Sequence, residues 1–135
     1  MCQFGCPNSA NPQSPIAGTG GPPGNTQYTL PDGSVIQRDG GGNIPDELVG
    51  EISNEVGTIS MANTGAPNSG GSQFFLNVAD NKNLDWFSPG QSKHPVFGKA
   101  VDKASYDIMV KISKVPTTDD CPKTPVKMNS VTVAM

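Results

Sequence analysis

Positive charge is scarce in this 135-residue sequence. Arg38 is the only arginine, and 9 lysine and arginine side chains stand against 12 aspartates and glutamates, so the formal net charge is -3. Proteins that bind nucleic acid concentrate positive side chains against the phosphates. The composition therefore predicts no nucleic-acid partner.

Long hydrophobic runs are also absent. None approaches the roughly 20 residues that a membrane-spanning helix needs. The N-terminal MCQFGCPNSA has neither the basic region nor the apolar stretch of a signal peptide. We therefore expect no membrane insertion, no targeting segment within these residues and a cytoplasmic location.

Residues that bind metals are few. Histidine occurs once, as His94, and cysteine three times, as Cys2, Cys6 and Cys121, at spacings that match no zinc motif. We expect no metal site and reduced, structural cysteines. A redox pair formed by Cys2 and Cys6 is the alternative.

Common catalytic motifs are missing as well. The sequence has no phosphate-binding loop ending in Gly-Lys-Ser or Gly-Lys-Thr and no Gly-x-Ser-x-Gly, which argues against kinase and hydrolase chemistry. Residues 18–21 are rich in glycine but lead into Pro22 and Pro23 without a following helix. A tight surface turn explains them better than a phosphate site.

Glycine (16) and proline (13) together exceed a fifth of the chain and argue against a fold of long helices. A mass of 14.0 kDa indicates one domain. Its folded surface should be about 6,700 Å², against about 20,000 Å² for the unfolded chain. This leaves room for one hydrophobic core.

Glycine and proline are concentrated before position 57. There the turn formed by residues 31–34 separates two extended runs, 26–30 and 35–38, which predicts a small β-hairpin. Residues 43–49 could begin a helical turn with Pro45 near its start, before Gly50 interrupts it.

The next segment alternates at the period of a strand. Residues 58–62 predict a buried strand, and residues 73–78 predict another. The second strand would have an apolar face and a mixed face. The apolar face carries Phe74, Leu76 and Val78, and the mixed face carries Gln73, Phe75 and Asn77.

Further strands are expected at 95–101 and, with a bulge, at 126–133. The one good helix candidate spans about 103–113, with Asp102 as its N-cap and Pro116 soon after its end. Many short strands and one helix indicate a mainly β fold, closed or sandwich-like.

Residues 58–98 read TISMANTGAPNSGGSQFFLNVADNKNLDWFSPGQSKHPVFG. This stretch resembles the central motif of the cyclophilin-type peptidyl-prolyl isomerases, because SMAN, GSQFF, LD and H-x-VFG occur in the family's order. Residues 18–21 resemble the family's loop, residues 1–3 its Phe-Met-x-Gln-Gly region, and residues 101–133 its closing helix and last strand. Residues 22–42 resemble an insertion found in a divergent branch.

The resemblance implies a closed antiparallel β-barrel, here incomplete, in a single domain spanning residues 1–135 that lacks the family's N-terminal strands and first helix. It also implies catalysis of rotation about X-Pro bonds in protein folding, with proline-containing peptides or proteins as partners and no cofactor. Amide resonance sets a barrier near 20 kcal/mol to that rotation. The site should hold the proline ring in an apolar pocket and favour the twisted amide.

Site residues follow from the matching positions. Phe75, Met1 and Leu84 would line the proline pocket, while Gln73 and Gln3 would contact the substrate backbone. Gln73 would take part in catalysis as well as in binding. Without the motif, Phe75 and Leu84 would be assigned to the core.

Five further positions complete the implied site. Asn63 would bind the residue before proline, with Ala62 and Thr64 bordering that groove. His94 would lie at the pocket rim as the second catalytic residue, and Gly18 would form part of the neighbouring wall.

The sequence departs from the family pattern at the arginine that stabilises the twisted amide and at one pocket phenylalanine, which have no counterparts. Arg38 lies in the inserted segment, where a surface contact is expected. Asn83 stands where many relatives have tryptophan, which puts binding of cyclosporin-like ligands in doubt, and Trp86 is expected to pack within its loop.

Three explanations follow for the missing part. The sequence is N-terminally incomplete, with Met1 an internal methionine, which we favour; or a partner chain covers the open barrel edge; or the protein is a rearranged noncatalytic relative. The functional alternative to an isomerase is therefore a noncatalytic proline-peptide-binding or scaffold subunit of a larger assembly.

Overall fold

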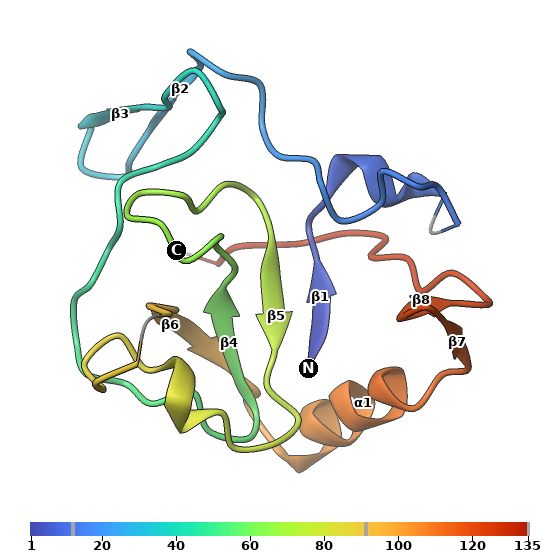
Figure 1. Ribbon diagram of the computed structural model, residues 1–135. Helices are drawn as coiled ribbons and strands as arrows, with labels where there is room; N and C mark the ends of the chain where they lie inside the picture. Colours follow the sequence, from blue (N-terminus) through green and yellow to red (C-terminus); the bar gives the residue numbers. More distant parts are fainter. Residues whose placement is uncertain (12, 91, 135) are drawn as a thin grey trace.

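A four-stranded antiparallel sheet forms the centre of the computed structural model, which describes residues 1–11, 13–90 and 92–134 (Figure 1). Its strands lie in the order β1-β5-β4-β6. Their bounds are Cys2–Phe4 for β1, Phe74–Leu76 for β5, Thr58–Met61 for β4 and Val96–Lys99 for β6. The strands predicted at 58–62, 73–78 and 95–101 are therefore present, each in shorter form.

Smaller elements surround this sheet. Two ladders pair β2 (Gln27–Thr29) with β3 (Val35–Gln37) and β7 (Thr117–Thr118) with β8 (Cys121–Pro122). Short 3-10 helices span Pro7–Ala10 (η1) and Lys82–Leu84 (η2), and α1 spans Lys103–Ser113. The described part of the chain is thus mainly β with one α-helix, and none of its helices has the length and apolar character to cross a bilayer.

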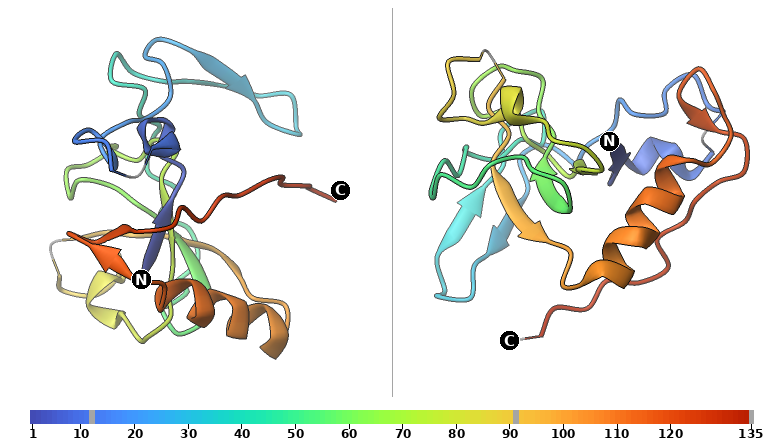
Figure 2. Two further views of the ribbon diagram at one scale, coloured as in Figure 1. Left: turned by 90° about the vertical axis from the view of Figure 1, so that its right-hand side faces the viewer. Right: turned by 90° about the horizontal axis from the view of Figure 1, so that it is seen from below.

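The β2–β3 hairpin was predicted and projects away from the central sheet (Figure 2). Asp32 fixes its turn, because its carboxylate accepts bonds from the backbone N–H and the hydroxyl of Ser34. The guanidinium carbon of Arg38 lies 4.6 Å from the ring centroid of Tyr28. This cation–π contact holds the chain's only arginine on the hairpin.

Helix α1 was also predicted, with the same N-cap. The Asp102 side chain accepts a hydrogen bond from the backbone N–H of Ser105. Met109 is 6% exposed, and the Tyr106 hydroxyl donates to the carbonyl of Val78. These contacts hold the helix beside the sheet, near β1 (Figure 1).

The central sheet has two unlike faces. Strand pairing places Gln3 opposite Phe75 and Phe75 opposite Ser60. We call the side that they share the mixed face, made up of Gln3, Thr58, Ser60, Gln73, Phe75 and Asn77. We call the other side the apolar face; it carries Phe4, Ile59, Met61, Phe74, Leu76 and Phe97.

Side chains on the mixed face are less exposed to solvent than Phe97 on the apolar face. Phe75, Ser60 and Asn77 are 2%, 0% and 0% exposed, whereas Phe97 on the apolar face is 59% exposed. On that face Phe4 stacks on Phe74, and Phe74 meets Phe97 edge to face. The aromatic side chains of the apolar face thus contact one another while remaining partly open to solvent.

The chain has room for one hydrophobic core, but the core that the described residues form is small. Among the described residues, Phe75 and Met109 are the only buried hydrophobic side chains. The accessible surface is 8885 Å², about a third more than the roughly 6,700 Å² expected for a compact monomer of this mass. The excess fits a sheet that has one apolar face uncovered.

Two predicted elements are wrong. Residues 43–49 form no helical turn: Ile44 bridges to Gly70, and Asp46 and Asn68 exchange backbone-to-side-chain bonds of 2.9 and 2.8 Å. These bonds hold the segment extended. Residues 126–133 form no strand either, and this coil, most of it exposed, extends from the body (Figure 2). A strand needs a neighbour for its backbone groups, and no ladder includes this coil.

Met109→Ala should destabilise the protein by about 2–4 kcal/mol, because it removes a buried side chain and leaves a cavity. Ile108→Ala is the matched control, since Ile108 is the preceding helical residue and is 59% exposed. It should change stability by about 0.5 kcal/mol or less. Urea unfolding followed by Trp86 fluorescence measures both, and equal losses would contradict this account of the helix.

Candidate functional site

A pair of glutamines joins two strands to the glycine-rich loop. The Gln3 amide nitrogen donates to Oε1 of Gln73 at 2.7 Å. The Gln73 amide nitrogen donates in turn to the carbonyls of Gly18 and Gly20, at 2.9 and 2.8 Å. Three positions predicted for the site, Gln3, Gln73 and Gly18, are therefore in direct contact.

The loop that carries Gly18 is anchored beyond β1. Gly5 has a φ of +86° and a Cβ there would lie 2.1 Å from the carbonyl oxygen of Ser72, so only glycine fits. The Ser72 hydroxyl donates to the Gly5 carbonyl at 2.6 Å. Cys6 then accepts a bond from the Gly20 N–H at 3.2 Å. This close approach seats the loop against β5.

The thiol of Cys6 lies in a polar surrounding. Burial raises its pKa, but hydrogen bonds from the Ser9 side chain and from the Gly20 backbone outweigh burial and lower it overall. Burial also raises the pKa of Cys2. Both thiols are free, as is that of Cys121.

Phe75 and His94 form the apolar part of the site. Their ring centroids are 5.4 Å apart, edge to face. His94 Nδ1 lies 2.9 Å from the carbonyl oxygen of Met61. A carbonyl only accepts, so Nδ1 carries the proton and Nε2 is the acceptor of the neutral ring. The His94 backbone N–H donates to the Leu84 carbonyl at 3.1 Å, which brings Leu84 next to this pair.

The SMAN motif runs past Gln73 and His94. The Ala62 N–H donates to the Gln73 carbonyl at 3.0 Å, and the Asn63 side chain donates to the carbonyl of Lys93, the residue before His94. Thr64 lies farther along the same segment, where its N–H donates to the Ser69 hydroxyl. Asn63 and Ala62 thus adjoin the site directly, whereas Thr64 is held by its own loop.

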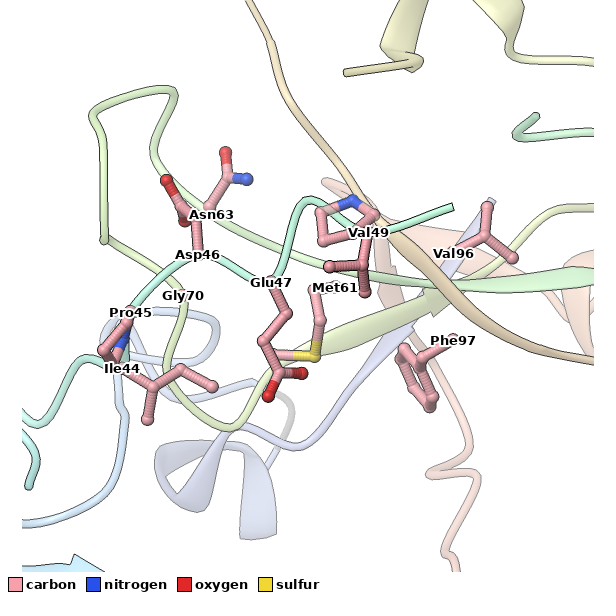
Figure 3. Close-up of a pocket in the computed structure, with 11 residues that line it drawn as sticks. Ile44, Pro45, Asp46, Glu47, Val49, Met61, Asn63, Gly70, Val96 and Phe97 are labelled. Carbon is pink, nitrogen blue, oxygen red and sulfur yellow. The ribbon is translucent and has the colours of Figure 1, made fainter. Parts of the chain in front are cut away.

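Two cavities adjoin these residues. One, of about 880 Å³, is lined by Met1, Gln3, Gly18 and Gln73, and it reaches the end of α1 and the segment after it. Met1 is 57% exposed and immediately precedes β1. The other, of about 190 Å³, lies between residues 44–49 and strands β4 and β6, with Met61, Asn63 and Phe97 in its wall (Figure 3).

A buried polar network lies behind the site and was not predicted. Asn54 is 0% exposed and Asp85 3%. The Asn54 side chain donates to Asp85 and to the His94 carbonyl, and accepts from the Ser60 hydroxyl. Asp85 belongs to the LD motif, which was the only signal in the sequence for this network.

Hydrogen bonds determine the ionisation of Asp85. Its burial raises the pKa, but donors from the Ser53 hydroxyl and from the backbone and side chain of Asn54 outweigh burial, with a smaller contribution from Lys82, and the pKa is lowered overall. The carboxylate is therefore charged at neutral pH and serves as an acceptor.

The groups at this site are polar amides and an imidazole beside an apolar ring. Amide and imidazole groups stand around an aromatic ring, an arrangement suited to a small apolar side chain flanked by backbone polar groups. Within residues 1–11, 13–90 and 92–134, no three histidine, cysteine or acidic side chains cluster as metal ligands do.

The model of the family described as "Cyclophilin type peptidyl-prolyl cis-trans isomerase/CLD" matches residues 1–133. The chain belongs to this family. The cyclophilin match spans nearly all of the sequence.

Curated relatives have names that agree with the family. A peptidyl-prolyl cis-trans isomerase of Acinetobacter baylyi is 40% identical over 95 residues, which are 67% of this chain and 49% of the relative. Peptidyl-prolyl cis-trans isomerase B of Escherichia coli is 38% identical over 100 residues, 67% of this chain and 58% of the relative. The chain thus spans about half the length of the curated relatives it matches.

The structure places Arg38 and Trp86, the two residues that lie nearest in type to groups the cyclophilin pattern would have and this chain lacks. Arg38 is bound to the hairpin by Tyr28 and by the hydroxyl of Thr26, with an Nη1 to Oγ1 distance of 3.5 Å. Trp86 donates to the carbonyl of Gly50 and meets Phe87 edge to face. Both side chains therefore make the packing contacts that the sequence suggested.

Asp85→Asn should lower the free energy of unfolding at pH 7 by about 2–3 kcal/mol, because a buried acceptor of three bonds loses its charge. The pKa of Asp85 is lower in the folded protein than the ordinary aspartate value of 3.8, which applies to the unfolded chain. At a pH between these two pKa values the unfolded chain therefore binds more protons than the folded protein. The stabilisation is therefore fully present above pH 3.8 and is lost as the pH falls through the folded pKa. In urea unfolding, the difference between wild type and variant should therefore stay constant from pH 7 down to the ordinary pKa of 3.8 and should shrink as the pH is lowered further.

Proposed function

We propose that this chain binds proline-containing segments at the site around Phe75 and promotes rotation about their X-Pro bonds. The observation that supports this most directly is the adjacency of Gln3, Gln73 and Phe75 on the mixed face, with His94 against the Phe75 ring. Family membership supports the type of reaction.

Each group has a part in this proposal. The proline ring would pack against Phe75, and the amides of Gln73 and Gln3 would bind the substrate backbone. Phe75 is 2% exposed, so the side chains that cover its ring would have to move for the proline ring to enter. Asn63, beside His94, would bind the residue before proline.

Rotation needs no bond cleavage. The barrier near 20 kcal/mol comes from amide resonance, and it falls when the site binds the twisted amide more tightly than the planar one. Within residues 1–135 the family's arginine has no counterpart, and Arg38 is held on the hairpin. By analogy with other electrostatic donors, its lack would reduce the rate about 10²- to 10³-fold.

The apolar face supports a finer proposal about the fold. We propose that its side chains belong to the interior of a closed β-barrel, and that further strands, of the same domain or of a partner chain, cover them in the working protein. Residues 22–42 would then be an insertion at its surface. The large exposed area and the 59% exposure of Phe97 support this.

The binding proposal predicts discrimination between peptides. A tetrapeptide with a central Ala-Pro should shift the resonances of the Phe75 and His94 rings in NMR titration, whereas the same peptide with Ala-Ala should not. Gln73→Ala should weaken binding about tenfold, through loss of about one net hydrogen bond. Exchange spectroscopy on the same samples measures the rate of isomerisation.

The matched control is Gln27→Ala, because Gln27 is exposed on the hairpin. It should leave binding unchanged, as should Arg38→Ala. Equal binding of both peptides would contradict the proposed site. Binding without measurable isomerisation would favour the noncatalytic subunit, and a version extended upstream would then show whether activity needs more of the domain.

The exposed apolar face favours this second function, a scaffold subunit that docks through that face. Phe97→Ser should reduce self-association in sedimentation velocity, since an exposed aromatic cluster promotes contacts between copies. Phe87→Ser is the control, because Phe87 lies in a loop against Trp86. A monomer at all concentrations, with or without the substitution, would argue against docking through this face.

A further inference from the structure

The carboxylate of Asp85 is buried among neutral donors. Its Oδ2 accepts from the Ser53 hydroxyl at 2.6 Å. Its Oδ1 accepts from the backbone and the side chain of Asn54, at 2.7 and 2.9 Å. Neither of the two ion pairs in the described structure includes it. A buried charge is costly unless its acceptor sites are filled, so this geometry requires Ser53 and Asn54 to face Asp85.

Asn54 connects Asp85 to the candidate site, because its side chain bonds both the Asp85 carboxylate and the His94 carbonyl. Its side-chain nitrogen has two donors, one used on Asp85 and the other on the carbonyl of His94, at 3.1 Å. Its side-chain oxygen accepts from the Ser60 hydroxyl at 2.6 Å. Reversing the amide would place its oxygen against the Asp85 carboxylate. The charge on Asp85 therefore fixes which way the Asn54 amide points.

His94 is consequently held at three points. Asn54 binds its carbonyl, the Leu84 carbonyl accepts its N–H, and the Met61 carbonyl accepts from Nδ1. Leu84 precedes Asp85 in the chain, so the hydrogen bonds of the Asp85 carboxylate also hold Leu84, whose carbonyl accepts from the His94 N–H. The His94 residue so held has its ring edge to face with the Phe75 ring.

We propose that Asp85 and Asn54 are positioning residues, which hold the His94 ring in its Nδ1-protonated form against Phe75 and keep Leu84 beside it. This inference rests on the proposed function for its consequence, the affinity for prolyl peptides. The placement and the tautomer of the His94 ring are properties of the free protein, and they can be tested without a peptide.

His94 is the only histidine in the sequence, so its ring signals are unambiguous in NMR. In the wild-type chain, ¹⁵N shifts at a pH where the ring is neutral should show the proton on Nδ1. Asp85→Asn removes the negative charge on which three donors converge. The Asn54 side chain is then no longer held in one orientation. We expect a mixture of His94 tautomers in this variant. Its affinity for the Ala-Pro tetrapeptide should be at least about tenfold lower than that of wild type, because small displacements of site groups weaken their interactions.

Asp80→Asn is the matched control. Asp80 lies in the adjoining loop and is exposed, and its carboxylate accepts one bond, from the Val56 N–H at 3.2 Å. The same chemical change there should leave the His94 tautomer and the affinity as in wild type. An equal change in both variants would contradict the proposal.

Ser53→Ala is the milder variant, for use if Asp85→Asn does not fold. It removes the donor to Oδ2 and leaves both Asn54 bonds, so it should move the His94 signals in the same direction by a smaller amount. A folded variant, of either kind, whose His94 signals match wild type would overturn the positioning role. Failure of the wild-type chain to bind the peptide would instead overturn the proposed function, and the tautomer result would still decide the inference.

Discussion

The burial of the Asp85 carboxylate is the constraint that most of the site depends on. A charge that is 3% exposed persists only if hydrogen-bond donors surround it, and the chain supplies them from Ser53 and Asn54. Asn54 lies 31 residues before Asp85 and also binds Ser60 on β4 and the carbonyl of His94. One carboxylate therefore connects Leu84 and His94 to β4, the strand that pairs with the strand of Phe75.

The same network explains why the mixed face of the sheet is the better buried one. Asn77 donates to the hydroxyls of Thr58 and Ser60, both at 2.9 Å, and accepts from Asn81 at 2.8 Å. Polar groups that bond to one another can be removed from water at little cost. The apolar face has no such cover among the described residues, and its aromatic rings pack on each other while partly exposed.

Local patterns predicted local elements well. Asp102 and the helical periodicity of the residues after it predicted α1 with its N-cap. The turn containing Asp32 and Gly33 predicted the hairpin. The ordered motifs of residues 58–98 predicted the family, which the match over residues 1–133 shows. The strand predicted at 126–133 and the helical turn at 43–49 were wrong, since a strand needs a pairing partner and the Asp46 and Asn68 pair competes with a helix.

The sequence by itself determined the residue types of the site and the family to which they belong, because these depend on a fixed order of short motifs. Only the tertiary structure decided which face of the sheet is buried and how Gln3 meets Gln73, which is 70 residues away. It also revealed Asn54 and Asp85 as a pair. Such contacts depend on how strands and loops pack in space, and neither periodicity nor spacing records the distance between two side chains that the fold brings together.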